Sequence, residues 1–442
     1  MAQEEDMIKT VLRLWKGIHN GRSARAFVAL AVFASLFLAG CSRVDPELTL
    51  AAGNAVPLDG MKAVIAAFTA KTGIKVNLEL MPGGQEGDNL LKTRLASGDA
   101  ADINLYNSGS LFLALNPAEN FVDLSKEPYT GSVIDSYKAT VSTGGKVYAA
   151  PAQAIAGGGW YYNKTIYAKL GLEVPKTWND LMANLEKIKE ANIVPVIGSY
   201  KDSWTTQMVL LADNYNVLAN SPAFGEDYTA HKATFANTPA ALRGFEKLAE
   251  LYAKGYVNKD ATSTTFDMAL KMLATGEGVH YPMISFIGGS LAGINPETAK
   301  DIGFFAQPGD DPNSNGLTIW MPNGLSVYKQ SKNISAAKKF IAFYMSAEGW
   351  AVNFAALKPE GPLAIKGIKL PEGLLASVMD MLPYVESGKT APALEFISPI
   401  KGPNLPQIAV QTALGMKSPL ENAEEYDKDV QKQAKQLGLA GW

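Results

Sequence analysis

Cysteine and histidine are almost absent from this chain of 442 residues. Its single cysteine, Cys41, excludes an internal disulfide and a cysteine-rich metal site. Histidine occurs only at His19, His231 and His280, and the two that lie beyond the N-terminal segment are too few for a three-histidine zinc centre. His280 stands in a strand-like stretch, where we expect a hydrogen-bonded histidine of the core or of a cleft edge. We therefore expect no metal ion and no other cofactor.

Arginine, basic runs and a hydrolase motif are also missing or scarce. After Arg43 the only arginines are Arg94 and Arg243, so we do not expect a site that holds an anion between several guanidinium groups. Charged residues make up 19% of the chain and the formal net charge is -3, with no basic block beyond Arg43. Nucleic acid is therefore not an expected partner. The spacing Gly-x-Ser-x-Gly of a hydrolase nucleophile does not occur.

The first 40 residues have the order of a secretory signal peptide. Basic residues up to Arg25 precede an uncharged apolar run over 26–38, which is shorter than the roughly 20 residues that span a bilayer. Residues 38–41, Leu-Ala-Gly-Cys, resemble the bacterial lipoprotein box. We expect cleavage before Cys41 and acylation there, which would anchor an exported protein on the extracytoplasmic side of a membrane, in the periplasm or at the cell surface. The alternative is a buried cysteine beside an uncleaved anchor helix.

The part of the chain that follows Cys41 is too long for one core and favours two domains. Apolar patterns predict strands over 48–52 and 74–80, joined by a helix over 58–72 that ends at Gly73. A helix over 89–97 and a buried strand over 102–106 follow. Because strands alternate with helices here and further along the chain, we expect parallel sheets that are covered on both faces. Further strands are expected at 160–162 and 195–197, and further helices at 164–170, 181–191, 240–254, 265–275, 335–346 and 423–437.

Several stretches, in this order, resemble the extracellular solute-binding proteins of bacterial ATP-driven (ABC) importers, family 1, whose members include maltodextrin and multiple-sugar binders. The most specific are Tyr-Asn-Lys at 162–164 and Pro-Lys-Thr-Trp at 175–178, the latter inside a predicted capping box at Thr177. The other matching stretches are residues 145–151, 160–164, 170–181, 272–279 and 331–340. The resemblance extends from about residue 48 to the C-terminus.

The resemblance implies an α/β fold of the periplasmic-binding-protein-like type II, with two lobes, a hinge that the chain crosses three times and a cleft between the lobes. We expect the crossings near residues 151–154, 279–283 and 323–327. The expected division is a signal peptide over 1–40, an N-lobe of 41–152 plus 281–325, and a C-lobe of 153–280 plus 326–442. Such clefts close around a ligand that contacts both lobes.

A neutral sugar needs flat aromatic surfaces for its C–H faces and polar side chains for its hydroxyl groups. Loops at the carboxyl ends of parallel strands are where open α/β sheets bind ligands. Trp178 and Trp350 fall on predicted helices, where a core or surface role is expected, so the remaining tryptophans of the globular part are better candidates. The candidate ligand-binding residues are Trp204, Trp160, Trp320, Asp202, Asn107, Tyr106, Phe286, Gln85 and Glu360.

The resemblance implies a monomeric, membrane-tethered receptor that binds a sugar or oligosaccharide and delivers it to the permease subunits of an ABC transporter, without bond chemistry. Two alternatives remain at this point. An exported glycoside hydrolase would place two carboxyl groups roughly 5 to 10 Å apart across the sugar. The same fold with a different cargo would bind a polyamine, a peptide, a phosphate ester or a metal chelate.

Overall fold

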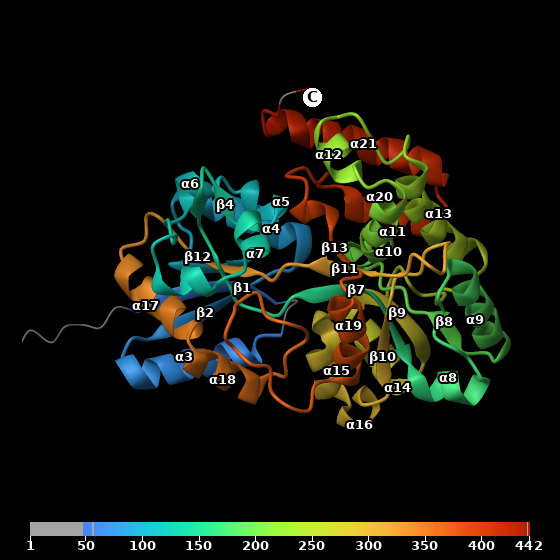
Figure 1. Cartoon of the computed structure of the whole chain (residues 1–442), viewed down its shortest axis with the longest axis horizontal. Helices are drawn as coiled ribbons and strands as arrows, with labels where there is room; N and C mark the ends of the chain where they lie inside the picture. The colour runs from blue at the N-terminus through green and yellow to red at the C-terminus, as the bar shows by residue number, and fades with distance from the viewer. Residues whose placement is uncertain (1–46, 55–56, 440) are drawn as a thin grey trace, which may run out of the picture. The chain divides into compact units, whose positions relative to one another are not determined.

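The computed structural model of the chain describes residues 47–54, 57–439 and 441–442. The predicted signal peptide and the predicted acylation site at Cys41 lie outside these residues. Two sheets, each with its own hydrophobic core, organise the described part (Figure 1). We call the portion built on the first sheet the first lobe and the portion built on the second sheet the second lobe. Within the described residues, none of the helices combines the length and the apolar character that crossing a membrane requires.

The sheet of the first lobe has five strands in the order β2-β1-β3-β12-β6. Strand β1 runs parallel to β2 and β3, because a helix returns the chain after each of the first two strands. Strand β12 is antiparallel to both of its neighbours, so the sheet is mixed and not purely parallel as predicted. The strands are β1 (Leu48–Gly53), β2 (Val76–Met81), β3 (Ile103–Tyr106), β6 (Ala150–Pro151) and β12 (Gly324–Val327), and a separate hairpin joins β4 (Ser142–Thr143) to β5 (Lys146–Val147).

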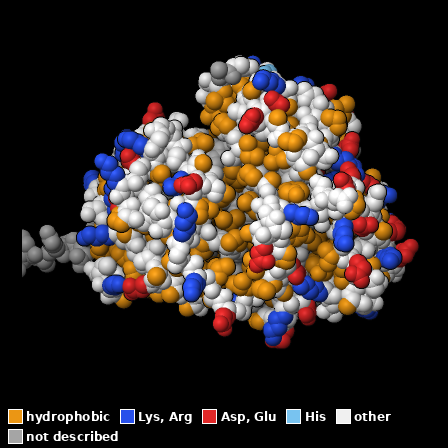
Figure 2. Space-filling view, in the orientation of Figure 1, with side chains coloured by type: hydrophobic (Ala, Val, Ile, Leu, Met, Phe, Trp, Pro, Cys, Tyr) orange, Lys and Arg blue, Asp and Glu red, His pale blue; other side chains and the backbone are white. Residues whose placement is uncertain are grey.

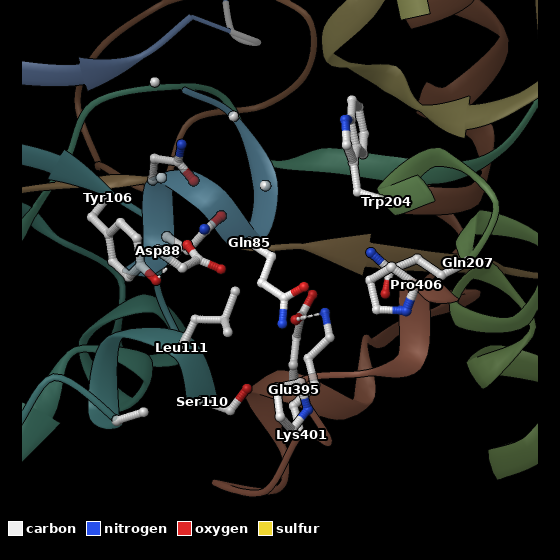
Figure 3. Close-up of a pocket in the computed structure, with 18 of the residues that line it drawn as sticks. Gln85, Asp88, Tyr106, Ser110, Leu111, Trp204, Gln207, Glu395, Lys401 and Pro406 are labelled. Carbon is white, nitrogen blue, oxygen red and sulfur yellow. Dashed lines mark hydrogen bonds and ion pairs between the residues drawn. The ribbon is translucent and has the colours of Figure 1, made fainter. Parts of the chain in front are cut away.

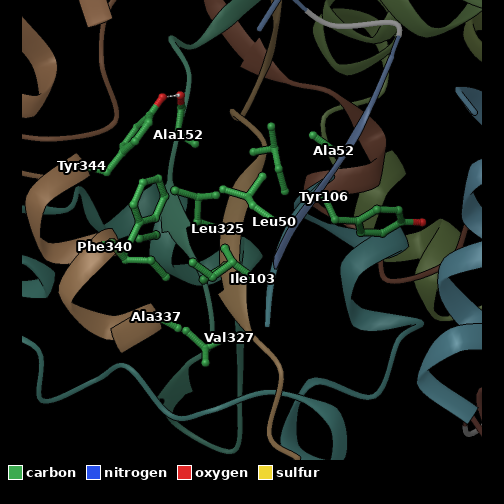
Figure 4. Close-up of a cluster of buried hydrophobic side chains, with 14 of the residues drawn as sticks. Leu50, Ala52, Ile103, Tyr106, Ala152, Leu325, Val327, Ala337, Phe340 and Tyr344 are labelled. Carbon is green, nitrogen blue, oxygen red and sulfur yellow. Dashed lines mark hydrogen bonds between the residues drawn. The ribbon is translucent and has the colours of Figure 1, made fainter. Parts of the chain in front are cut away.

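Apolar side chains of this sheet pack against helices that come from two distant segments of the chain, residues 59–140 and 334–356. Figure 4 shows Leu50, Ile103 and Leu325 of the sheet beside Phe340, while Tyr344 Oη donates a hydrogen bond of 2.7 Å to the Ala152 carbonyl. The helices of this lobe are α3 (Asp59–Thr72), α4 (Gly84–Ser97), α5 (Ser110–Leu113), α6 (Pro117–Asn120), η2 (Pro128–Ser132), α7 (Asp135–Thr140), α17 (Ile334–Tyr344) and α18 (Ala347–Ala356).

The second lobe is built on a six-stranded mixed sheet with β7 at its centre. Strand β7 pairs with β9 on one side, and with β10 and β11 one after the other on the opposite side, in each case antiparallel. Its side chains are buried over nearly the whole length, as expected for a strand covered on both faces. The strands are β7 (Ala156–Asn163), β8 (Val194–Val196), β9 (Gly278–Ile284), β10 (Ile302–Ala306), β11 (Leu317–Trp320) and β13 (Thr390–Pro392).

The helices predicted over 164–170, 181–191, 240–254, 265–275 and 423–437 are present in the second lobe, whereas its other helices were not predicted. The capping box is present: Thr177 Oγ1 accepts from the Asp180 amide, and the Asp180 carboxylate accepts from the Thr177 amide. The helices are α8 (Lys164–Leu170), α9 (Trp178–Glu190), η3 (Ser203–Thr205), α10 (Met208–Ala212), α11 (Asn214–Asn220), α12 (Phe224–Thr229), α13 (Pro239–Ala253), α14 (Phe266–Thr275), η4 (Ser285–Ile287), α15 (Gly288–Ile294), α16 (Pro296–Ala299), α19 (Ala376–Glu386), η5 (Leu394–Phe396), α20 (Leu405–Ala413) and α21 (Pro419–Gln436).

The chain passes between the sheets at three places, two of which lie near the predicted positions. The first crossing joins β6 to β7 and the second joins β11 to β12. The predicted crossing at 279–283 is wrong, because these residues are the interior of β9, which pairs with β7. Strands β10 and β11 therefore place most of the segment 281–325 in the second lobe, and α17 and α18 place residues 334–356 in the first. The third crossing lies between α18 and α19 instead.

Candidate functional site

A cavity of about 280 Å³ lies between the two lobes. The carboxyl-terminal residues of the parallel strands β1, β2 and β3, namely Gly53, Met81 and Tyr106, all line its first-lobe side. This is the edge at which open α/β sheets bind ligands, because the loops that leave the strands there are free to carry side chains. The second-lobe side is lined by residues of η3, α10, η4 and η5 and by the ends of β9 and β11.

On the first-lobe wall, Tyr106 and Asp88 form a hydrogen-bonded pair. Tyr106 Oη donates to Asp88 Oδ1 at 2.7 Å, from the end of β3 to the second turn of α4 (Figure 3). Burial raises the pKa of the Asp88 carboxyl above its usual value, and the hydrogen bond from Tyr106 opposes that rise. Lys92, one helical turn further along α4, also lines the cavity.

On the second-lobe wall, Glu395 joins an indole to an ammonium group. Trp320 Nε1 donates to Glu395 Oε1 at 2.6 Å, and Lys401 Nζ donates to Glu395 Oε2 at 2.7 Å. The Glu395 and Lys401 side chains are only 10% and 14% exposed, so this ion pair is largely shielded from solvent. Both carboxylate oxygens of Glu395 are thus occupied by neighbours from the same lobe, which fixes the orientation of the Trp320 ring.

Three aromatic rings of the second lobe form an apolar surface beside the cavity. The ring of Trp204 lies 5.2 Å from that of Phe266 and 6.4 Å from that of Phe286, measured between centroids, and the Trp204 and Phe286 planes differ by 25°. Trp204 and Phe286 line the cavity and are partly exposed, whereas Phe266 is buried behind them. Figure 2 shows apolar atoms gathered along the strip where the two lobes meet.

The lobes touch at the rim of this cavity. Gln407 Nε2 on α20 donates a hydrogen bond of 3.0 Å to Gln85 Oε1 on α4. A Cβ atom added at Gly109, which precedes α5, would lie 2.5 Å from the carbonyl oxygen of Glu395 on the other lobe. Gly109 also has a φ of 74°, so both its backbone conformation and its close approach require glycine.

A second, smaller cavity of about 110 Å³ adjoins the first and shares Asn107, Phe286, Trp320 and Glu395 with it. The partly buried Glu360 also lines this cavity, and its Oε1 accepts a hydrogen bond of 3.1 Å from the Gly289 amide of α15. Desolvation raises the pKa of the Glu360 carboxyl well above its usual value. Glu360 forms no ion pair with another described residue.

Most of the predicted ligand-binding residues meet at these two cavities. The first cavity is lined by Trp204, Trp320, Asn107, Tyr106, Phe286 and Gln85, and the second by Glu360. Gln85 lies in the first turn of α4 and not in the loop expected there, because α4 begins at Gly84, five residues earlier than the predicted start at Asn89.

Two predicted residues lie elsewhere. Trp160 is 0% exposed in the core of the second lobe, where its Nε1 donates to Gln307 and its ring stacks on Phe305. It lies inside β7, which is longer than the predicted strand, so the side chain is buried by sheet packing. Asp202 Oδ2 accepts a hydrogen bond of 2.6 Å from the Phe266 amide at the start of α14, which satisfies a free helix-terminal donor. The structure therefore places neither residue on the walls of the two cavities.

Sequence reasoning missed several polar residues that line the first cavity: Asp88, Ser110, Gln207, Glu395 and Lys401. Asp88 follows a glycine-rich stretch that was expected to be a loop, and Gln207 comes directly after the polar segment that contains Trp204. The sequence around Asp88 and Gln207 was thus only a weak indication that they line a ligand site. The sequence around Glu395 and Lys401 gave no indication of a ligand site. These residues follow the third crossing, and only the tertiary structure brings them to the cavity.

His280, the histidine expected in the core or at a cleft edge, lies in the core of the second lobe. His280 is fully buried, and its ring nitrogens hydrogen-bond to Tyr167 Oη at 2.6 Å and to the Pro195 carbonyl at 2.8 Å. Burial lowers its pKa to about 4, so the ring is neutral at physiological pH. Over the described ranges, no group of three or more His, Cys, Asp or Glu side chains is arranged to hold a metal ion.

Comparison with known proteins places this architecture in a family. The chain is 26% identical over 321 residues to the multiple sugar-binding protein of Streptococcus mutans, a match that covers 70% of this chain and 73% of that protein. The structure of a chitin oligosaccharide binding protein superimposes with a TM-score of 0.76 at 20% identity, over 88% of this chain and 99% of the other. RafE in complex with raffinose gives a TM-score of 0.71 at 20% identity, over 87% and 99% of the two chains.

These similarities agree with the sheets described above, since the TM-scores over nearly the whole of both relatives indicate that they share the fold of this chain. The family model of the bacterial extracellular solute-binding proteins matches residues 53–349, a segment that includes most of both sheets and two of the three crossings. The chain therefore belongs to the family of bacterial extracellular solute-binding proteins.

Proposed function

We propose that the cavity between the lobes binds an uncharged sugar or oligosaccharide, and that the protein delivers it to the permease of an ABC transporter. The observation that carries this proposal is the composition of the cavity walls. Trp204, Phe286 and Trp320 offer flat apolar surface, while the side chains of Tyr106, Asn107 and Gln85 offer hydrogen-bonding groups. A sugar ring presents both kinds of surface, C–H groups on its faces and hydroxyl groups around its rim.

The charges in the cavity favour a neutral ligand. Two carboxylates, Asp88 and Glu395, and two ammonium groups, Lys92 and Lys401, line it. Glu395 and Lys401 neutralise one another at 2.7 Å, so neither a cation nor an anion finds an excess of opposite charge there. A polyamine would need a cluster of unpaired carboxylates, and a phosphate ester would need several free cations.

The relatives support the same ligand class. The name of one sequence relative refers to multiple sugars, and another is the melibiose/raffinose/stachyose-binding protein MelE of Bacillus subtilis, which is 24% identical over 306 residues. Two structural relatives were solved in complex with raffinose and with stachyose. We propose a ligand of this class for the present protein, with the contacts supplied by its own cavity residues.

We further propose that the protein is an exported, monomeric lipoprotein that is tethered by acylated Cys41, and that it performs no bond chemistry on its ligand. The segment before Cys41 supports export and acylation by its pattern. The arrangement of Glu395 supports a structural role in the cavity wall, because its two oxygens accept hydrogen bonds from Trp320 and Lys401. Mass spectrometry of the mature protein from the membrane fraction tests the acylation, and Cys41→Ser should release the protein from membranes.

The ligand class is tested by thermal unfolding of the purified protein with raffinose, stachyose, diacetylchitobiose and galactose, with spermidine and glucose 6-phosphate as charged controls. A ligand present at 100 times its dissociation constant adds about 2.7 kcal/mol of stability. We expect at least one neutral sugar to raise the unfolding midpoint and neither charged compound to do so. Stabilisation by spermidine or by the phosphate ester alone would contradict the proposal, and release of chromophore from a nitrophenyl glycoside would favour a hydrolase.

A further inference from the structure

Two residues that line the main cavity from opposite lobes each carry a buried side-chain atom without a hydrogen-bond partner among the described residues. These atoms are Ser110 Oγ, on the first-lobe helix α5, and Gln207 Oε1, directly before α10 of the second lobe. Both residues line the cavity, and they are only 2% and 7% exposed. In Figure 3, Ser110 projects from the first-lobe side toward Glu395 and Lys401, and Gln207 lies on the second-lobe side between Trp204 and Pro406.

Unpaired atoms of this kind are uncommon in folded proteins, where most buried polar side-chain atoms have a partner. An unsatisfied buried donor or acceptor lowers stability, because it has lost its water without gaining a protein partner. Ser110 and Gln207 are held in this state by their surroundings. The backbone of Gly109, with a φ of 74°, sets the start of α5, and Gln207 follows the 3-10 turn that carries Trp204.

Three other polar groups of the cavity walls are already hydrogen-bonded within the protein. Tyr106 donates to Asp88, and the Trp320 indole and Lys401 both donate to Glu395. A ligand that binds these groups must replace or share an existing hydrogen bond, so its net gain is small. A ligand that binds Ser110 Oγ and Gln207 Oε1 gains hydrogen bonds that the ligand-free protein does not make.

We propose that Ser110 and Gln207 are specificity-determining residues that bind hydroxyl groups of one ligand, one residue from each lobe. The inference rests on the proposed function, a sugar in the cleft. The Gln207 side chain carries an accepting oxygen and a donating NH2 group, so it can bind a sugar hydroxyl, which also donates and accepts. The Ser110 hydroxyl both donates and accepts, so it tolerates either kind of partner. Because the two residues belong to different lobes, a ligand that contacts both stabilises the closed arrangement.

The test uses Gln207→Met, which keeps the approximate length of the side chain without its amide, and Ser110→Ala. Thr206→Val is the matched control, because Thr206 Oγ1 is also buried without a partner but Thr206 does not line the cavity. Affinity for raffinose, stachyose, diacetylchitobiose and galactose is measured by calorimetry, and ligand-free stability by thermal unfolding. We expect each cavity variant to bind the sugar about tenfold more weakly, since one hydrogen bond is lost.

The ligand-free stabilities separate a ligand-binding role from a structural one. Removing an unpaired buried polar atom should leave the unfolding midpoint unchanged or raise it. A lower midpoint in the ligand-free cavity variants would overturn the inference, because it would show that the side chains serve the fold. Unchanged sugar affinity in both variants would also overturn it while leaving the proposed function intact. Failure of the wild-type protein to bind any of the four sugars would contradict the proposed function itself, and the inference with it.

Discussion

Trp320 Nε1 donates a hydrogen bond of 2.6 Å to Glu395 Oε1, and this contact joins the end of strand β11 to the turn η5 at the wall of the cavity. The second oxygen of Glu395 accepts from Lys401, so a single carboxylate holds both an indole ring and an ammonium group in place. The orientation of the Trp320 ring, which lines the cavity, thus depends on the Glu395 carboxylate even if Glu395 does not contact the ligand.

Replacement of Glu395 should therefore affect stability and binding together. Glu395→Ala leaves the Lys401 ammonium largely buried without its partner, and we expect a loss of about 3 kcal/mol in the free energy of unfolding, measured by urea denaturation. Sugar affinity should fall as well, because the Trp320 ring is released. The double variant Glu395→Ala with Lys401→Met should recover part of the stability, and a double variant no more stable than Glu395→Ala would argue against the ion pair as the cause.

The two tryptophans Trp204 and Trp160 should respond in opposite ways. Trp204→Ala removes a partly exposed ring that lines the cavity, so we expect sugar binding to weaken at least tenfold with a modest loss of stability. Trp160→Phe removes a fully buried indole and its hydrogen bond to Gln307, so we expect about 1–3 kcal/mol lower stability and nearly unchanged affinity. Calorimetric titration and chemical denaturation of both variants measure this difference. Equal losses of affinity in the two variants would argue against the cavity as the binding site.

Closure of the lobes should depend on Gly109. Gly109→Ala places a Cβ within 2.5 Å of the Glu395 carbonyl oxygen, so we expect the lobes to stay apart and the ligand to bind more weakly. Gly145→Ala is the control, because Gly145 has the same φ of 74° but no atom within 4 Å of an added Cβ. Both variants should lose about 1–3 kcal/mol of stability through backbone strain. Small-angle scattering with saturating ligand should show a larger radius of gyration for Gly109→Ala only.

The stability of the protein should carry a pH dependence from Glu360. Because burial raises the folded-state pKa of Glu360 well above its usual value, the folded state binds more protons than the unfolded state between these two values. This carboxyl therefore lowers stability as pH rises through that window, and the penalty is fully present above the folded-state pKa. Glu360→Gln keeps an acceptor for the Gly289 amide and removes the ionisation. The variant should be more stable than the wild type at pH 8, and the difference should shrink toward pH 4.5. A constant difference at all pH values would contradict this assignment.

Local signals in the sequence predicted most of the long helices and several of their ends. Thr177 and Asp180 form the predicted capping box, and Gly73 and Gly171 take the left-handed conformation at the predicted helix ends. These features depend on residues within one or two turns of each other, so a single chain segment contains all the information that they need. The stretches that resemble solute-binding proteins likewise predicted the family and the two-lobed fold.

Only the tertiary structure decided which side chains reach the cavity. Trp160 and Trp204 were both plausible candidates from the sequence. Strand β7 places Trp160 in the core, whereas η3 places Trp204 at the cavity. Trp320 and Glu395 are 75 positions apart, and Ser110 and Gln207 belong to different lobes. Pairings of this kind depend on where the chain crosses between the sheets. The crossing predicted inside β9 is wrong, and this error assigned most of residues 281–325 to the wrong lobe. The sequence could not show it, because the sheet to which a strand belongs is decided by the strands that pair with it.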